Sequence, residues 1–152
     1  MAPFFVKGEK IVLKRNGVWF ADGIEITHEQ TRDLFFRSIH WDEKTNDEGQ
    51  HFYLEVGYER LFFDVEDTPY FVVSLGEESD GRLFANLTNS VKSPIQHDLL
   101  SYENTSLYLT LSNGFKARFL AAPYYDLLKH LEEDATGYYV EIAGQKKILL
   151  KK

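Results

Sequence analysis

The 152-residue chain has no cysteine, one methionine and four prolines. Without cysteine there can be no disulfide framework, thiolate zinc site or cysteine nucleophile, and a reducing compartment is favoured. No apolar run approaches the roughly 20 residues that a membrane span needs. The opening MAPFFVKGEK is also too short and too early charged for a signal peptide. We therefore expect a cytoplasmic protein that does not enter the membrane.

The common catalytic motifs are absent as well. The chain has no G-x-S-x-G elbow, no G-x-x-x-x-G-K phosphate loop and no G-x-G-x-x-G dinucleotide turn. Its five histidines show neither H-x-H nor H-E-x-x-H spacing, so a zinc site would have to combine distant segments. The sequence predicts no cofactor and no metal site, and it leans away from an enzyme.

The formal net charge of -7 argues against broad affinity for nucleic acid, which depends on cations that neutralise phosphates. Lysines and an arginine nevertheless gather at the two ends of the chain: Lys7, Lys10, Lys14, Arg15, Lys146, Lys147, Lys151 and Lys152. These cations either solvate the outer faces and ends of strands or, if the termini meet, form one local basic patch. A nucleic-acid-binding protein that uses the terminal lysines is therefore one alternative function.

The first half of the chain alternates short β-forming runs with turn signals. Strands are expected over 11–14 and 18–20, joined by Asn16-Gly17, and Asp22-Gly23 turns the chain again. The stretch from Thr27 to Gln30 fits a capping box, with a helix running to about residue 41. The polar run 42–50 is a loop by composition. Further hairpins are expected to pair 52–56 with 61–65, 71–75 with 82–87, and 107–111 with 115–119.

The second half repeats the plan of the first. Pro123 suits the first turn of a helix that places Tyr124, Leu127, Leu128 and Leu131 on one face, and strands over 138–142 and 146–150 follow. The segment YLEVGYERLFF then aligns with YVEIAGQKKILL, so that Arg60 falls on Lys146. We interpret this as an internal duplication of a hairpin-helix-hairpin unit, dividing the chain at 1–68 and 69–152.

The expected fold class is α+β, with antiparallel sheets that are each packed by one helix. Two similar units that pack face to face create a groove, and clefts between domains are a favoured place for ligands. Unpaired strand edges in two small sheets also suggest a homodimer. The sequence therefore directs the search for a site to the junction of the two halves.

Three acids, Asp64, Glu66 and Asp67, precede the Thr68-Pro69 step. In an extended segment Asp64 and Glu66 point to one face, and the loop lacks the further oxygen ligands that calcium requires. Proline holds the residue before it in extended geometry, and an Asp before Thr-Pro can bond its own backbone amides. We interpret the segment as a bend, with a ligand-facing acid, a metal site or acid-base catalysis as alternatives.

Two pairs of neighbouring residues present opposite faces of a strand. In Trp19-Phe20 one ring faces the core, and the other could form a platform for an aromatic or sugar ring. Glu59 and Arg60 cannot both line one pocket unless a turn intervenes.

Read in order, several motifs resemble the bacterial domain-of-unknown-function 1285 (DUF1285) family. They are G-x-W-F-x-x-G-x-x-I (17–26), a helix with LF, Y-L-x-x-x-x-E-R (53–60), V-E-D-x-P-Y-F-V (65–72), the pair Thr88-Asn89, and N-G-F-x-A-R-F followed by YYDLL (113–128). The match covers nearly the whole chain. The sequence departs from the family where Glu25-Ile26-Thr27 replaces Pro-Ile-Arg, and where Leu120-Ala121 stands in place of a usual Arg.

The resemblance implies a duplicated α+β architecture with a C-terminal part like a pleckstrin-homology fold. It implies no enzymatic activity and a ligand site where the two parts meet. The loss of two cations relative to the family disfavours an anionic or nucleic-acid ligand. Carried over to matching positions, the candidate ligand-binding residues are Trp19, Glu59, Arg60, Glu66, Asp67, Thr88, Asn89 and Arg118.

The leading hypothesis is a non-enzymatic binding or regulatory protein that holds a small molecule or a peptide between two related halves. One alternative is an enzyme in which Glu66 or Asp67 acts as general base while Arg60 or Arg118 stabilises an anion. That reaction needs the carboxylate and the guanidinium to converge on one reacting position. The other alternative is the nucleic-acid binder described above.

Overall fold

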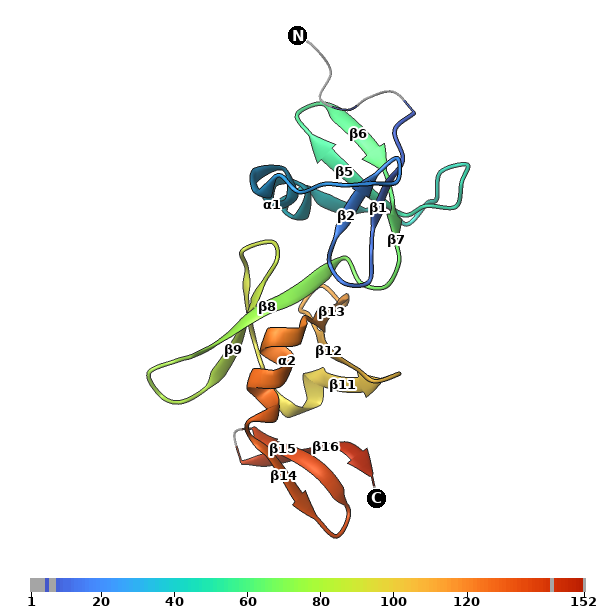
Figure 1. Ribbon diagram of the computed structural model, residues 1–152. Helices are drawn as coiled ribbons and strands as arrows, with labels where there is room; N and C mark the ends of the chain where they lie inside the picture. Colours follow the sequence, from blue (N-terminus) through green and yellow to red (C-terminus); the bar gives the residue numbers. More distant parts are fainter. Residues whose placement is uncertain (1–4, 6–7, 143, 152) are drawn as a thin grey trace. The chain divides into compact units, whose positions relative to one another are not determined.

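The computed structural model describes residues 5, 8–142 and 144–151. It contains two compact units, residues 1–69 and 70–152, built mostly from antiparallel sheets with two α-helices (Figure 1). The α+β class expected from the sequence is confirmed. Among the described residues, neither helix has the length and apolar character needed to cross a bilayer.

Unit 1 begins with a four-stranded sheet in the order β3-β2-β1-β7. Its strands are β1 (Ile11–Leu13), β2 (Trp19–Ala21), β3 (Ile24–Glu25) and β7 (Asp64–Val65). Asp22 and Gly23 both adopt positive φ, 49° and 80°, which suits the tight turn between β2 and β3. The last strand pairs with β1 in parallel, so a segment from the end of unit 1 completes the sheet begun at its start.

Helix α1 (Glu29–Arg37) starts one residue later and ends about four residues earlier than the sequence predicts. The N-cap is His28 and not Thr27, because the His28 side chain accepts the Thr31 amide hydrogen at 3.3 Å. Ser38 caps the other end, and the residues expected to continue the helix form β4 (Ile39–Trp41). The aromatic and β-branched run IHW pairs with the following hairpin instead of extending the helix.

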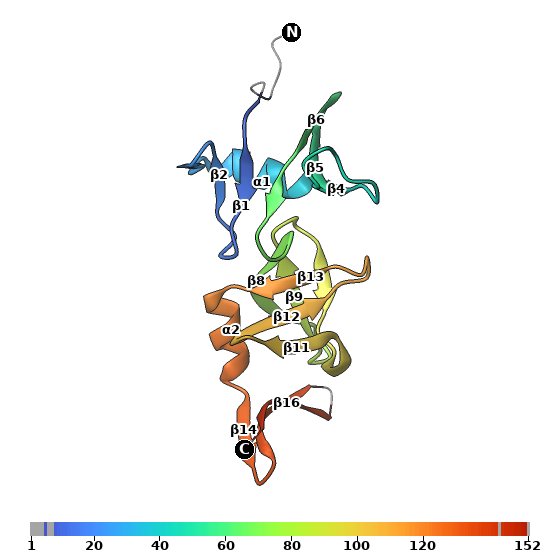
Figure 2. The ribbon, with the colours of Figure 1, turned by 90° about the vertical axis from the view of Figure 1, so that its right-hand side faces the viewer.

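The second sheet of unit 1 has the order β4-β5-β6, with β5 (Phe52–Val56) and β6 (Glu59–Phe62) forming the expected hairpin. The predicted strand over 61–65 is broken at Phe63, whose side chain is buried. The core of the unit is aromatic: Trp19 contacts Phe35, Phe36 and Phe63 with ring centroids 5.2–5.3 Å apart. These rings join both sheets to α1, which Figure 2 draws between β1 and β5.

Unit 2 is built around a six-stranded sheet in the order β10-β9-β8-β13-β12-β11. Its strands are β8 (Tyr70–Glu77), β9 (Leu83–Leu87), β10 (Lys92–Pro94), β11 (Leu100–Glu103), β12 (Ser106–Thr110) and β13 (Lys116–Phe119). The hairpins expected for β8 with β9 and for β12 with β13 are confirmed. The central pair β8 and β13 is parallel, and a 3-10 turn, η1 (His97–Leu99), precedes β11.

Helix α2 (Ala121–Leu128) packs on β8 and buries Pro123 and Leu127. The helix ends before Leu131, which the sequence placed on its apolar face. That residue instead starts β14 (Leu131–Asp134) and is exposed. With β15 (Gly137–Ile142) and β16 (Gln145–Lys151) this strand forms a three-stranded antiparallel sheet. The core of unit 2 combines buried residues of the large sheet with Leu127, Val140 and Ile142.

The two aligned hairpins share their register. Glu55 lies opposite Arg60 in β5 and β6, and Glu141 lies opposite Lys146 in β15 and β16. In each hairpin the cation sits over a tyrosine ring: the Arg60 Cζ lies 4.9 Å from the ring centroid of Tyr53, and the Lys146 Nζ 4.4 Å from that of Tyr139. This agreement is local. The duplication and the pleckstrin-homology-like character of the C-terminal part remain predictions.

Candidate functional site

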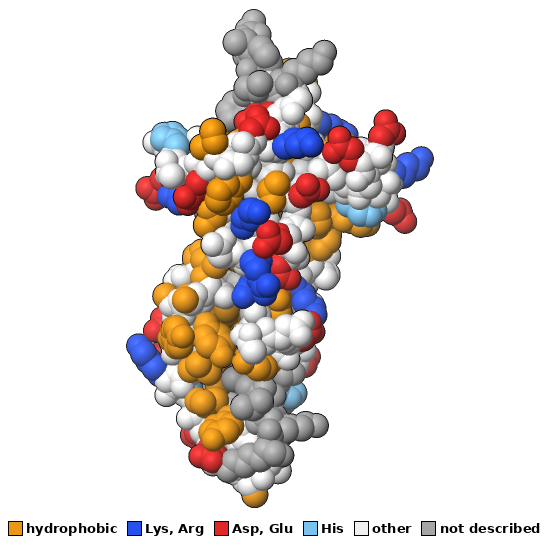
Figure 3. All heavy atoms as spheres, turned by 45° about the vertical axis from the view of Figure 1, so that its right-hand side comes forward, with side chains coloured by type: hydrophobic (Ala, Val, Ile, Leu, Met, Phe, Trp, Pro, Cys, Tyr) orange, Lys and Arg blue, Asp and Glu red, His pale blue; other side chains and the backbone are white. Residues whose placement is uncertain are grey.

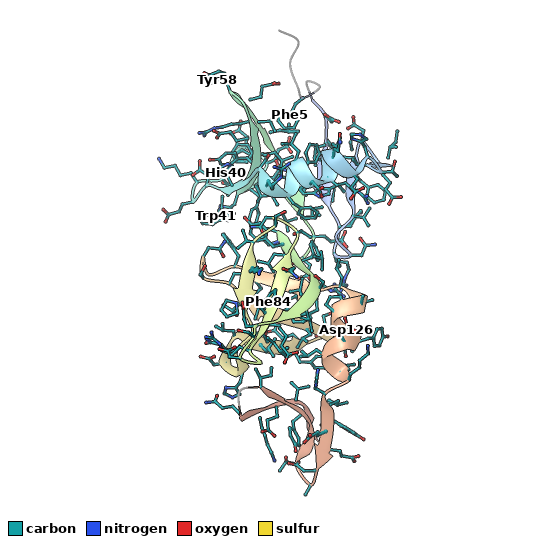
Figure 4. The ribbon with its side chains drawn as sticks, turned by 90° about the vertical axis from the view of Figure 1, so that its left-hand side faces the viewer. Phe5, His40, Trp41, Tyr58, Phe84 and Asp126 are labelled. Atoms are coloured by element: carbon teal, nitrogen blue, oxygen red, sulfur yellow. The ribbon has the colours of Figure 1, made fainter. Side chains whose placement is uncertain are left out.

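A large hollow of the described structure lies wholly within unit 2. It is an open groove of about 1110 Å³ between the far end of the β8–β9 hairpin, β10 with η1, the end of α2 and the β15–β16 turn. Figure 4 shows the side of the molecule on which Phe84 of this hairpin lies. The lining comes from four segments that are distant in the sequence. The sheet and helix of unit 2 therefore bring together residues that no local motif links.

The floor of the groove is apolar. Ile95, Leu127 and Ile142 line it, and each belongs to the buried core of unit 2. Leu127 is fully buried because α2 presses it against the large sheet. An apolar floor that is already packed is the usual foundation of a ligand pocket, since it excludes water from one side of the ligand without rearrangement.

One polar group lies among these apolar side chains. Ser93, on the edge strand β10, lines the groove and is only 8% exposed. The described residues supply no hydrogen-bond partner for its hydroxyl group. The hydroxyl oxygen is not among the fully buried polar atoms that lack a partner, so it keeps access to the water of the groove and can exchange that water for a ligand atom. A ligand seated in the groove could supply the missing hydrogen bond.

Charged side chains surround this floor. The acids that line the groove are Glu77, Glu78, Asp80, Asp98 and Glu141, and the cations are Arg82 and Lys92. The Arg82 Nε lies 2.6 Å from the Asp80 carboxylate, and the Asp80 side chain also accepts the Arg82 amide hydrogen at 3.2 Å. The backbone hydrogen bond is the main reason why the pKa of Asp80 is lowered, with the Arg82 charge adding to it.

The second cation, Lys92, lies over an aromatic ring. Its Nζ is 4.4 Å from the centroid of Phe84. On the adjacent strand Gly76 stands opposite Phe84, and a Cβ atom built on Gly76 would come within 2.2 Å of the Phe84 ring. The glycine therefore leaves room for the ring to lie across β8, and the ring in turn carries the lysine.

The eight residues predicted from the resemblance divide between the units, five in unit 1 and three in unit 2, and none of them lines the groove. Trp19 is fully buried and packs among the rings of α1 and Phe63. Its indole nitrogen finds no hydrogen-bond partner among the described residues. Trp19 is therefore the residue of the Trp19-Phe20 pair whose ring faces the core.

Glu59 and Arg60 lie on neighbouring positions of β6 and make separate contacts. The Glu59 carboxylate accepts the Phe5 amide hydrogen at 3.1 Å. The Arg60 Nε forms an ion pair with Glu55 at 3.0 Å. Arg60 also lines a smaller hollow of about 330 Å³ in unit 1. In Figure 4 the nearby Tyr58 marks the tip of this hairpin, where its side chain points away from the unit.

Glu66 and Asp67 form a bend between β7 and β8, which confirms the bend interpretation of this segment. The Glu66 amide donates to the Leu13 carbonyl at 2.9 Å. Its carboxylate lies 3.5 Å from the Lys14 Nζ and accepts the Arg15 amide hydrogen at 3.4 Å. The contacts of Glu66 therefore hold the bend against the turn that follows β1. Arg60 pairs with Glu55 and not with Glu66.

In unit 2 the three predicted residues belong to the sheet framework. The Thr88 Oγ1 accepts the Phe71 amide hydrogen at 3.2 Å, which continues the β8–β9 pairing by one residue. The Asn89 side chain accepts the Val91 amide hydrogen at 3.3 Å and shapes the turn into β10. Arg118 lies on β13 between Phe71 and Tyr108 of the neighbouring strands. Each of these side chains thus has a structural position in the large sheet.

Sequence reasoning missed the groove. Its acids at 77–80 belong to the GEESDG connection, which composition marks only as a turn. Ser93 is one serine among many, and nothing in the sequence shows that its strand is an edge of the sheet or that its side chain lines a groove. The sequence also placed Gly76 in the turn after the strand 71–75, whereas it lies inside β8 opposite Phe84.

A second apolar surface of unit 2 covers α2. Figure 3 shows hydrophobic side chains gathered over this part of the unit. Tyr125 is 63% exposed and lies edge-on to Tyr124 at 5.5 Å. Burial, followed by a hydrogen bond with Tyr102, raises the pKa of Tyr124. This surface is not enclosed, so it offers contact area without the apolar floor and walls of the groove.

The described residues include no group of three or more histidine, aspartate or glutamate side chains placed to hold a metal ion. Of the terminal cations, Lys14 pairs with Glu66 and Lys146 with Asp134. Lys7 and the side chains of Lys147, Lys151 and Lys152 lie outside the described residues.

Two solved structures share this fold. A DUF1285 family protein from Silicibacter pomeroyi DSS-3 matches with a TM-score of 0.65 and 18% identity, over 93% of this chain and 80% of its own. A DUF1285 family protein from Shewanella baltica OS155 matches with a TM-score of 0.59 and 17% identity, over 82% of this chain and 94% of its own. No family model and no curated protein matches the sequence. The resemblance to the DUF1285 family is thereby confirmed at the level of the fold.

Proposed function

We propose that this protein is a non-enzymatic binding protein and that the groove of unit 2 holds a small organic ligand. The observation that carries the proposal is the Ser93 hydroxyl, which lines the groove without a hydrogen-bond partner among the described residues, beside a floor that is apolar. Ligand pockets combine these features, in that apolar area supplies affinity and a few polar groups fix orientation. The apolar part of the ligand lies on the partly exposed Leu83 and over the floor at Ile142, and one polar atom bonds Ser93.

The size of the groove supports the same proposal. Pockets for small molecules span roughly 300–1,000 Å³, and the groove measures about 1110 Å³. It can therefore take a drug-sized molecule with some solvent remaining. Because every lining residue belongs to unit 2, this site does not depend on the cleft between the two halves that the sequence suggested, which remains a separate prediction.

A thermal-shift screen of a metabolite library, followed by calorimetry on the hits, tests the proposal. The informative variant is Ser93→Ala. Its matched control is Ser106→Ala, because Ser106 is 5% exposed, also has an unpartnered hydroxyl, and lies outside the groove. Neither substitution breaks a hydrogen bond to a described residue, so both variants should keep nearly the stability of the wild type.

We expect hits that raise the Tm of the wild-type protein and of Ser106→Ala, and that bind Ser93→Ala about tenfold or more weakly, the loss typical of one hydrogen bond to a ligand. A library without hits would count against a small-molecule site. Hits that bind Ser93→Ala as tightly as the wild type would place the site elsewhere.

A further inference from the structure

The lining of the groove has an excess of negative charge that its own cations do not neutralise. Five acids face two cations, and both cations have partners: Arg82 pairs with Asp80, and Lys92 lies over Phe84. No ion pair with a described side chain engages the other four acids, which are Glu77, Glu78, Asp98 and Glu141. Glu141 lies opposite Lys146, but the Lys146 Nζ bonds the Asp134 carboxylate at 2.7 Å.

These four acids come from separate elements. Glu77 and Glu78 lie at the end of the β8–β9 hairpin, Asp98 on η1 and Glu141 on β15. A run of acids along one strand or loop is commonly no more than a solvated surface. Here the fold brings carboxylates from three places to the rim of one groove that also has an apolar floor. Clefts lined by one sign of charge concentrate the field, which raises the local concentration of counter-ions.

We propose that the ligand of this groove is a small organic cation, an ammonium or guanidinium group attached to an apolar body. The inference rests on the proposed function and names the class of ligand for the same site. The cationic head lies among the rim carboxylates, where one of its N–H groups donates to the Ser93 oxygen. The apolar body covers Leu83 and the floor at Ile142.

The chemistry of each partner agrees with this orientation. A serine hydroxyl has two acceptor lone pairs, and an ammonium group has only donors. Hydrogen bonds from an ionised donor are shorter and stronger than those between neutral groups. An anionic ligand, in contrast, would have to sit beside four carboxylates, with Lys92 as the one cation of the described lining that forms no ion pair.

A matched series of probes separates charge from shape. Phenylbutylamine, phenylbutanol and phenylbutanoate share an apolar body and differ in the charge of the head group. We expect calorimetry to show the amine binding at least about tenfold more tightly than the carboxylate, with the alcohol between them. Raising the NaCl concentration should weaken the binding of the amine, because salt screens exposed charges, and should leave the affinity for the alcohol nearly unchanged.

Variants of the rim test the assignment to the groove. Glu77→Gln combined with Glu141→Gln should reduce the preference for amine over alcohol several-fold and leave the affinity for the alcohol in place. Glu43→Gln is the matched control, because Glu43 is an exposed acid of unit 1 that does not line the groove. Equal losses in the rim and control variants would show a general charge effect and overturn the assignment.

The remaining outcomes distinguish the two proposals. If the alcohol and the carboxylate bind as tightly as the amine, the cationic class is wrong, while the groove stands as the binding site. If none of the three probes binds but uncharged library hits depend on Ser93, the cationic class is wrong and the proposed function stands; if the library gives no hits either, both proposals are overturned. A capped Lys-Leu peptide is a further probe. If this peptide binds and the amine does not, the ligand is a basic side chain of a polypeptide and not a small organic cation.

Discussion

Among single residues, Gly76 is constrained by space and not by backbone conformation. Its φ angle is not among the positive values found at the turn glycines of this chain. A Cβ atom at this position would come within 2.2–2.8 Å of three atoms of the Phe84 ring. Real side chains do not approach so closely, so the ring must leave its place across β8 if the glycine acquires a side chain.

We expect Gly76→Ala to destabilise the protein by about 1–3 kcal/mol, the usual cost of inserting a methyl group into a filled site. Displacing the ring also removes the platform of Lys92. Urea denaturation measures the loss. In the Phe84→Ala background the same substitution should cost much less, because the obstructing ring is gone. Equal losses in both backgrounds would show that the ring is not the cause.

The two tryptophans differ in environment. Trp19 is fully buried among aromatic rings, and Trp41 is 43% exposed and stacks on His51 at 4.9 Å. In a Trp41→Phe variant all tryptophan emission comes from Trp19. We expect this emission to be blue-shifted and protected from iodide quenching, and the emission of a Trp19→Phe variant to be red-shifted and readily quenched. Strong quenching of Trp19 by iodide would contradict its core position and restore it as a candidate ligand contact.

Residue-level prediction failed at the candidate site for a physical reason. The alternation of Trp19 and Phe20 shows that one ring faces inward, but it does not show which residues pack against it. The three rings around Trp19 come from α1 and from the break at Phe63. The contacts of Thr88 and Asn89 with backbone amides likewise depend on strand pairing. Their structural positions could be recognised only after the fold was known.

Among the elements, hairpins were the most predictable. Turn residues such as Asn113-Gly114 carry a local signal, and the pairings of β8 with β9 and of β12 with β13 follow from it. Elements fixed by distant partners were not predicted. Residues 39–41 continue a helical pattern yet pair with β5, and β7 pairs in parallel with β1 across more than half of unit 1. Tertiary pairing there overrides local propensity.

The sheet formed by β14, β15 and β16 is linked by one ionised side chain. The Asp134 Oδ2 lies 2.7 Å from the Lys146 Nζ, while its Oδ1 accepts the amide hydrogens of Thr136 at 2.8 Å and of Gly137 at 3.2 Å. The hydrogen bond from Lys146, followed by those from Thr136, holds the pKa of Asp134 far below its ordinary value. The same bond to Asp134 raises the pKa of Lys146.

The lowered pKa fixes the sign of a pH dependence. A carboxyl group with a depressed pKa in the folded state stabilises the fold above its unfolded pKa, about 3.9 for aspartate, and loses that contribution as the pH falls toward the folded value. For the lysine, whose pKa is raised, the contribution is lost only as the pH rises above about 10.4. The ion pair should therefore contribute fully between about pH 5 and pH 9.

Asp134→Asn isolates this effect, because asparagine keeps an acceptor oxygen for the turn and loses the charge. We expect the difference in urea midpoint between the wild type and this variant to be constant near neutral pH and to shrink below about pH 4. Lys146→Met should remove most of the same acid dependence, since it removes the main cause of the shift. An unchanged acid profile in both variants would show that the pair does not form in solution.

In the whole molecule, the α+β class could be read from the order of hairpins and helices. The groove could not. Its floor combines Ile95, Leu127 and Ile142, which meet only because the large sheet, α2 and β15 share one core. Its acids gain significance only when they converge from three elements. Contacts of this kind are not encoded in any window of the sequence.

The separation into two compact units leads to a prediction for the whole chain. Each unit has its own buried core: the rings around Trp19 in unit 1, and the cluster that includes Leu109, Ala117 and Val140 in unit 2. A domain of this size is near the lower limit for independent folding but commonly folds alone. We expect residues 70–152, expressed separately, to unfold cooperatively in urea at a lower midpoint than the full chain.

The same fragment tests where the ligand binds. Because all lining residues of the groove lie in 70–152, the fragment should bind phenylbutylamine within about threefold of the affinity of the full chain, a free-energy difference of less than about 1 kcal/mol. The Ser93→Ala change should weaken binding equally in the fragment and in the full chain. A fragment that folds cooperatively but has lost all affinity would show that unit 1 contributes to the site, and it would return the search to the junction of the two halves.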